Sequence, residues 1–376
     1  MQKSLVIHFG AQKCGSSSIQ SSLSSIARAG TDSFRYQLFD SEIASGLSSS
    51  DDQERTSSLQ GLDHVLKGWK SGTLILSHEQ LGNLPASVNR IAERAITRFS
   101  ADQVIAIGYS RIQSSYFQAE YRQWYFRAVA RLRADMVFLE AQGLRADHFT
   151  PVERRMMVEA FNSFAARDPR RDWFHFYTIL MHQAASSATP YVVKSNHIPT
   201  ADRNYSLLAD FVAKTGILCS PDLIKSLDRR ANVSFSPVLC EAMAVALCNQ
   251  THDCAWIPGP HQGNAWLGSM NAKVSAESFK PTPLLCSQQL LRLAASAVDA
   301  NFRASNYSYC ELMNVERDYF DPGLAAAGEP SCGLTRPSLY ASFKCIEDQR
   351  SLQDVQAYEQ SLMPVLDLIR CSQPAF

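Results

Sequence analysis

A glycine-rich segment near the amino terminus contains the residue types of an anion-binding loop. It runs from Gly10 to Ser18 and reads GAQKCGSSS, so that Lys13 lies between two glycines and three serines end the segment. Glycine lets a loop backbone approach an anion closely, lysine supplies a positive charge, and serine hydroxyls donate hydrogen bonds. The segment therefore predicts a cradle for a phosphate-like group.

The predicted elements on either side of the loop would direct it toward such a group. Leu5–Phe9 is an apolar run of strand length, and Ile19, Leu23 and Ile26 recur at helical spacing. A helix that begins after the loop would present its unpaired N–H groups to an anion. The triphosphate-binding pattern GxxxxGK(S/T) places lysine directly after the second glycine, whereas this chain has Ser16 there.

Two later predicted strands also end in chemically capable side chains. A second apolar run is followed by His78 and Glu79, and a third, Val104–Ile107, leads to Arg111. Strands that alternate with helices predict an α/β fold with a central parallel sheet flanked by helices. Ligands bind at the carboxyl ends of such strands. We therefore expect Lys13, Glu79 and Arg111 to lie at one edge of the sheet.

The composition argues against several classes of protein. The chain has 376 residues and is 45% hydrophobic, which allows a large core, and 36 basic residues balance 36 acidic ones. A nucleic-acid-binding protein usually has a basic excess. No apolar stretch is long enough to span a membrane, and no signal-peptide core follows Lys3, so we expect a cytoplasmic protein. The ten cysteines form no CxxC pair and the histidines lack ligand spacing, so no metal site is predicted.

The loop resembles that of the sulfotransferases that use 3′-phosphoadenosine-5′-phosphosulfate (PAPS). Their 5′-phosphosulfate loop reads like PKSGTT, or like HIGxxKTGTTSIQ in many bacterial members, and residues 8–20 here read HFGAQKCGSSSIQ. The resemblance implies a three-layer, P-loop-like domain that binds PAPS, with PAP as the product. It implies these loop residues as PAPS ligands: Gln12, Lys13, Cys14, Gly15, Ser16, Ser17 and Ser18.

A second segment, residues 103–123, is similar to the 3′-phosphate-binding segment of the same family. By this resemblance Arg111 would clamp the 3′-phosphate through its planar guanidinium. The family has a serine eight residues after the arginine, whereas this chain has Ala119. Ser114 or Ser115 could supply the hydroxyl instead, and we count Ser115 among the PAPS ligands.

The family resemblance implies transfer of the sulfuryl group to a hydroxyl or amine of a small molecule or glycan, with a carbohydrate or glycolipid as the expected acceptor. Lys13 would stabilise the leaving phosphate, so that no metal is required. Related sulfotransferases use either histidine or a carboxylate as the base, and an SxE pattern in similar bacterial segments favours Glu79 over His78. The alternative for Glu79 is a structural role, as a helix cap or in an ion pair with Arg90 or Arg94.

Two other functions stay open on the residues alone. A nucleotide or sugar kinase with an altered phosphate loop is one, although Ser16 in place of lysine argues against it. A sulfotransferase-like protein that binds nucleotide without turnover is the other, and Ala119 favours it. We expect one α/β domain over residues 1–320, with a flexible loop at 40–60 and a cap loop at 255–283, and a helical extension over 321–376 that packs on the same domain.

Overall fold

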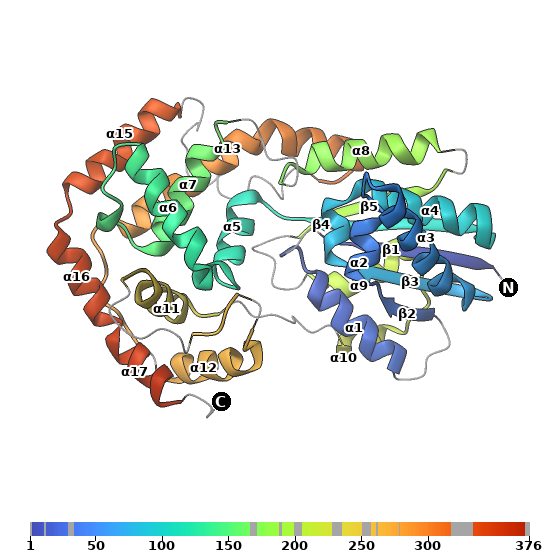
Figure 1. Ribbon diagram of the computed structural model, residues 1–376, viewed down its shortest axis with the longest axis horizontal. Coiled ribbons are helices and arrows are strands. Elements are labelled where there is room, and N and C mark those ends of the chain that lie inside the picture. The colour runs from blue at the N-terminus through green and yellow to red at the C-terminus, as the bar shows by residue number, and fades with distance from the viewer. Residues whose placement is uncertain are drawn as a thin grey trace. The chain divides into compact units, whose positions relative to one another are not determined.

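The chain folds into two compact units, each assembled from three separate segments (Figure 1). Unit 1 comprises Met1–Ile112, Asp168–Asn232 and Arg303–Gly328, and unit 2 comprises Gln113–Arg167, Val233–Phe302 and Glu329–Phe376. This division differs from the expected 1–320 and 321–376, because the helices after residue 112 pack with later helices around a core of their own. The computed structural model describes residues 2–10, 13–28, 34–165, 171–187, 190–198, 205–227, 235–249, 257–260, 262–277, 279–316 and 334–372.

Unit 1 contains a five-stranded sheet in which each pair of neighbouring strands is parallel. The strands lie in the order β2-β3-β1-β4-β5. Their bounds are β1 Lys3–Phe9, β2 Phe34–Leu38, β3 Gly72–His78, β4 Gln103–Ser110 and β5 Val192–His197. The predicted α/β fold with a parallel sheet flanked by helices is confirmed.

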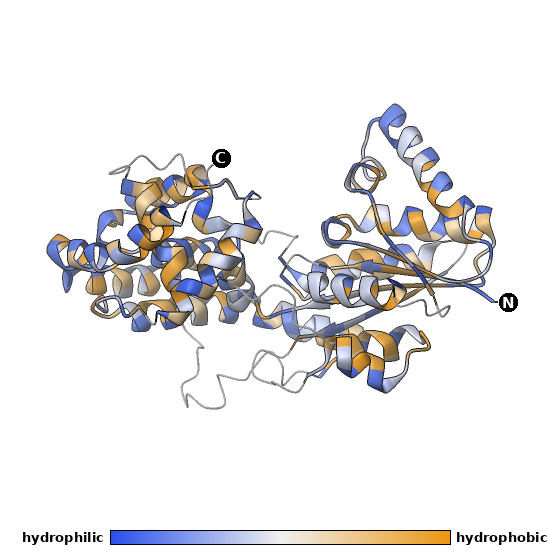
Figure 2. Cartoon of the chain, turned by 90° about the horizontal axis from the view of Figure 1, so that it is seen from below, coloured by the Kyte–Doolittle hydropathy of each residue, from blue (hydrophilic) through white to orange (hydrophobic). Residues whose placement is uncertain are grey.

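Helices cover both faces of the sheet (Figure 2). Consecutive residues of a strand point to opposite faces. His8 of β1 contacts Phe211 on one face, and Phe9 contacts Phe176 and Tyr177 on the other. The first face holds α1 Ser16–Arg28, α9 Leu207–Thr215 and α10 Pro221–Leu227, and the second holds α4 Pro85–Phe99 and α8 Trp173–Ser186.

The segment expected to be a flexible loop at 40–60 instead forms helices. They are α2 Ser41–Gly46 and α3 Asp52–Lys67. Asp40 and Asp51 cap the two helices, since each carboxylate accepts hydrogen bonds from two backbone N–H groups of the first turn. Leu62 and Leu66 are completely buried and anchor α3. Two aspartates of this segment are thus helix caps, and Ser58 is buried within α3.

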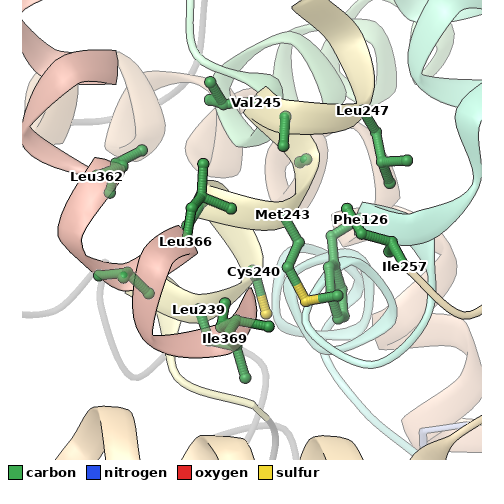
Figure 3. Close-up of a cluster of buried hydrophobic side chains, with 14 of the residues drawn as sticks. Phe126, Leu239, Cys240, Met243, Val245, Leu247, Ile257, Leu362, Leu366 and Ile369 are labelled. Atoms are coloured by element: carbon green, nitrogen blue, oxygen red, sulfur yellow. The ribbon is translucent and has the colours of Figure 1, made fainter. Parts of the chain in front are cut away.

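Unit 2 is helical in the part that the structure describes, and its core surrounds α11 (Figure 3). Phe126, Leu239, Met243, Leu366 and Ile369 are among the fully buried side chains. Its helices are α5 Gln113–Tyr121, α6 Val129–Ala141, α7 Pro151–Asn162, α11 Pro237–Asn249, α12 Asn264–Ala276, α15 Arg336–Asp348, α16 Leu352–Ser361 and α17 Met363–Cys371. Helix α13, Ser287–Met313, begins in unit 2 and ends in unit 1.

One sequence expectation in this unit needs correction. Between α5 and α6 the chain forms the 3-10 turn Tyr125–Arg127. The predicted cap loop at 255–283 contains helix α12. The guanidinium of Arg127 donates to the carbonyl oxygens of Gly259, Pro260 and Gln262, so a buried side chain organises the residues before α12.

Candidate functional site

The glycine-rich loop joins β1 to α1 with a tight backbone that only glycine permits at two positions. A Cβ atom on Gly10 would lie 1.6 Å from Ser16 Oγ, and Gly15 has a φ of +81° with Leu207 Cδ2 only 2.3 Å from the place of a Cβ. The Gly15 carbonyl accepts the N–H groups of Ser18 and Ile19, which starts the helix. Lys13 is also left-handed, with φ +67°, a conformation found mainly at constrained sites in non-glycine residues. Gln12 lies outside the described residues.

Cys14, within the loop, has a fully buried thiol. Burial raises the pKa of this fully buried thiol to about 12, while the charge of Arg111 lowers it, that of Glu79 raises it and that of Lys13 lowers it. Because β3 and β4 both pair in parallel with β1, the chain leaves these three strands at one edge of the sheet. Lys13, Glu79 and Arg111 therefore follow three adjacent strand ends, as expected, and Cys14 itself is a protonated, inert thiol.

The strand order explains why these side chains meet. In the order β2-β3-β1-β4-β5, the connection from β1 leads to β2 on one side of the sheet. The connection from β4 leads to β5 on the other side. Neighbouring strands whose connections leave in opposite directions define the point where ligands bind in open α/β sheets. That point lies between β1 and β4, at the loop after Phe9 and at Arg111.

Glu79 is held toward the loop rather than toward the helix that follows it. Ser17 Oγ donates a hydrogen bond of 2.9 Å to Glu79 Oε1. The structural partner considered for Glu79, Arg94, instead forms two hydrogen bonds of 2.6 Å to the carboxylate of Asp63. Arg90 Nη1 is buried and makes no hydrogen bond among the described residues. The ion-pair alternative with Arg94 is therefore wrong.

His78 lies at the end of β3 and caps the short 3-10 helix Glu79–Asn83. Its Nδ1 accepts the backbone N–H of Gln80 at 3.1 Å. Burial lowers the pKa of His78, so the ring is neutral at neutral pH. In this tautomer Nδ1 is occupied and Nε2 carries the proton, which makes His78 a hydrogen-bond donor rather than a base in this arrangement.

A buried polar group beneath the loop was missed by the sequence analysis. His8 Nδ1 lies 2.7 Å from Ser77 Oγ, and Gln20 Nε2 donates to the same oxygen at 3.2 Å. His8 is completely buried and burial lowers its pKa to about 3, so the ring is neutral. The signal was present as a histidine inside an apolar strand, and as Gln20 at the end of the loop motif. These contacts tie β1, β3 and α1 together under the candidate site.

Arg111 follows β4 directly and has an uncommitted side-chain atom. Its Nε is buried and makes no hydrogen bond among the described residues. A buried guanidinium N–H without a partner is costly, and such an atom in a native structure calls for an explanation such as an anionic ligand.

The serines considered as partners of Arg111 lie in α5 of unit 2. The N–H and hydroxyl of Ser114 donate to the two carboxylate oxygens of Asp299, at 2.9 and 2.6 Å, so the Asp299 carboxylate caps the start of α5. Ser115 and Ala119 are half-buried in the same helix.

Comparisons with known proteins add no family. The chain matches no known protein-family profile. No curated protein matches it either. The described residues contain no group of three or more His, Cys, Asp or Glu side chains that could hold a metal ion. Within the same residues, each helix is too short or too polar to span a bilayer.

Proposed function

We propose that this chain is a sulfotransferase with a P-loop-like anion cradle, which transfers the sulfuryl group of PAPS to a hydroxyl or amine of an acceptor such as a carbohydrate or glycolipid. The observation that carries the proposal is that Lys13, Glu79 and Arg111 follow three adjacent parallel strands at the switch point of the sheet, where Ser17 of the loop also bonds to Glu79. A cation in the loop after β1, a second cation after β4 and a carboxylate after β3 are the groups that sulfuryl transfer needs.

In the proposed complex the loop binds the 5′-phosphosulfate. The N-terminal N–H groups of α1, that of Ser17 among them, and the hydroxyls of Ser16 and Ser18 surround the anion. The ammonium of Lys13 neutralises the phosphate from which sulfur departs. The negative charge on that phosphate grows in the transition state, so Lys13 contributes to turnover more than to binding.

The two remaining charged side chains have separate roles. Arg111 binds the 3′-phosphate, which supplies an acceptor for its unpartnered Nε. The hydroxyl oxygen of the acceptor molecule forms a bond to sulfur, and the bond between sulfur and the 5′-phosphate oxygen breaks. Glu79 takes up the proton that this hydroxyl loses. Ser17 orients the Glu79 carboxylate by donating a hydrogen bond to Oε1. The other carboxylate oxygen, Oε2, accepts the proton from the acceptor hydroxyl.

A thermal-shift panel of PAP, ADP and ATP, each with and without Mg²⁺, tests the class of nucleotide. We expect PAP to raise the melting temperature most, and equally well without Mg²⁺. A preference for ATP that depends on Mg²⁺ would instead identify a kinase, and stabilisation by PAP without turnover on any acceptor would identify a binding protein.

The variant Arg111→Ala tests the nucleotide orientation. A charge-assisted bidentate contact contributes about 2 to 3 kcal/mol, so PAP affinity should fall by roughly 30- to 150-fold. The affinity for 5′-AMP, which lacks the 3′-phosphate, should change little. Equal weakening of both nucleotides would show that Arg111 does not bind the 3′ group.

A further inference from the structure

The backbone on both sides of Arg111 is fixed by hydrogen bonds from other parts of unit 1. The Ser110 carbonyl accepts the N–H of Ile198 at 2.9 Å. The Arg111 carbonyl accepts the indole Nε1–H of Trp173 at 2.7 Å. Trp173 is 2% exposed, so the donor indole of this hydrogen bond is buried. The peptide group of Arg111 is thus restrained while its Nε stays unpartnered among the described residues.

The side chain of Ser110 is restrained by a second, fully buried group of hydroxyls. Ser110 Oγ donates to the Tyr309 hydroxyl at 3.0 Å, and that hydroxyl lies 2.6 Å from Ser195 Oγ. Ser195 Oγ in turn donates to the Tyr177 hydroxyl at 2.7 Å. This chain of hydroxyls links the ends of β4 and β5 to α8 and to the last part of α13.

Trp173 is itself held in place by the start of α8. Asp172 caps this helix by accepting the N–H of His175, and its carboxylate also accepts a hydrogen bond from Ser305 of α13. Ser305 and Tyr309 are one helical turn apart, so one face of α13 supports both the indole and the hydroxyl chain. The support of Arg111 is therefore built from three elements that share buried polar contacts.

We propose that Trp173 and Tyr309 are positioning residues that hold Arg111 in the conformation that binds the 3′-phosphate. The inference rests on the proposed function, because it assigns a role to the backbone restraints of a residue proposed to bind PAPS. A planar guanidinium binds a phosphate well only in a narrow range of orientations. Restraining the peptide in advance lowers the ordering cost of binding, which is the advantage of preorganisation.

The chain contains a matched control for this role. Trp69 is 3% exposed, and its Nε1–H donates to the Gly72 carbonyl at 2.9 Å, at the start of β3. Trp69→Phe and Trp173→Phe each remove one buried indole N–H bond to a backbone carbonyl in unit 1. A purely structural role of the two bonds predicts similar losses of stability and no change in nucleotide preference in either variant.

The experiment measures PAP and 5′-AMP affinities by calorimetry for the native protein and for Trp173→Phe, Trp69→Phe and Arg111→Ala. We expect Trp173→Phe to lower the ratio of PAP to AMP affinity by roughly tenfold, the factor that corresponds to one hydrogen bond of about 1.4 kcal/mol. Trp69→Phe should keep the native ratio. Tyr309→Phe, which removes only the hydroxyl, provides the same test should Trp173→Phe fail to fold by circular dichroism.

The outcomes separate this inference from the function on which it rests. The positioning role would be overturned if Trp173→Phe and Tyr309→Phe kept the native ratio of PAP affinity to AMP affinity while Arg111→Ala lowered it. That result would leave the proposed function intact. An equal loss of ratio in the Trp69→Phe control would also overturn it, since the effect would then be a general one. A native protein that does not prefer PAP to AMP would refute the proposed function itself.

Discussion

The buried histidine beneath the loop should make the stability of unit 1 depend on pH in a calculable way. His8 is completely buried, and burial lowers its pKa from 6.5 to about 3. Between these two values the unfolded chain binds a proton that the folded chain does not. Stability due to this group is therefore complete above about pH 6.5 and is lost as the pH falls toward 3.

The magnitude follows from the two pKa values of His8. Linkage gives a loss of about 2 kcal/mol between pH 7 and pH 5, with a limiting value of about 5 kcal/mol near pH 3. In His8→Asn the amide can occupy the position of Nδ1 and keep the contact with Ser77, but it does not titrate. The variant should therefore lose about 2 kcal/mol less than the native protein over the same range.

The free energy of unfolding is measured in urea at pH 7 and pH 5 for the native protein and for His8→Asn. Hydrogen exchange in a peptide that contains β1 reports the unfolding of unit 1. Comparing the changes in free energy cancels the contributions of all other titrating groups. His64→Asn, at an exposed position of α3, controls for the change of residue type. Identical pH dependences for the native protein and His8→Asn would refute the idea that a neutral, buried His8 supports the loop.

Three further predictions concern the loop, the base and unit 2. Lys13→Met should reduce the rate of sulfuryl transfer by roughly a hundredfold, the effect of losing one stabilising contact to a developing anion, and steady-state kinetics with near-native turnover would exclude this role. Glu79→Gln keeps an oxygen that accepts the hydrogen bond from Ser17, but the amide cannot accept a proton. Turnover should therefore fall by roughly 10²- to 10⁴-fold while PAP affinity stays unchanged. If His78→Ala is the inactive variant instead, histidine is the base. Arg350→Ala removes the two hydrogen bonds that the buried Glu153 carboxylate accepts from Arg350, and it should destabilise unit 2 by about 3 to 5 kcal/mol in urea unfolding. Loss of an exposed pair would cost under about 1 kcal/mol.

Local sequence patterns were sufficient for the central strands of the sheet and for their ends. The apolar runs that predicted β1, β3 and β4 are long and buried, so their hydrophobic pattern is strong. Because the strands are parallel, the ends of these runs also predicted which side chains would lie at one edge of the sheet. By contrast β2 was missed, since in Phe34–Leu38 only Phe34 is buried and the strand lies at the edge of the sheet.

The division into units and the support of the site could not be read from local patterns. Unit 2 combines segments that are up to two hundred residues apart, as in the pair of Arg350 with Glu153. The contact of Trp173 with Arg111 depends on how α8 packs against β4, which periodicity does not specify. Only the aspartate before Trp173 gave a signal, as a cap that fixes where the helix begins.

The segmental assembly of the two units has a consequence for biosynthesis. Unit 1 begins with β1, but its buried hydroxyl chain is completed by Tyr309, about three hundred residues later. At roughly 5 to 20 residues per second, a ribosome needs about 15 to 60 s to synthesise the chain between them. During this time the β4–β5 edge and the start of α8 lack their partner in α13. A nascent chain stalled before residue 303 should therefore expose apolar surface and recruit chaperones. A fragment that ends at residue 320 would still lack α15, α16 and α17. Leu366 and Ile369 of α17 pack in the core around α11.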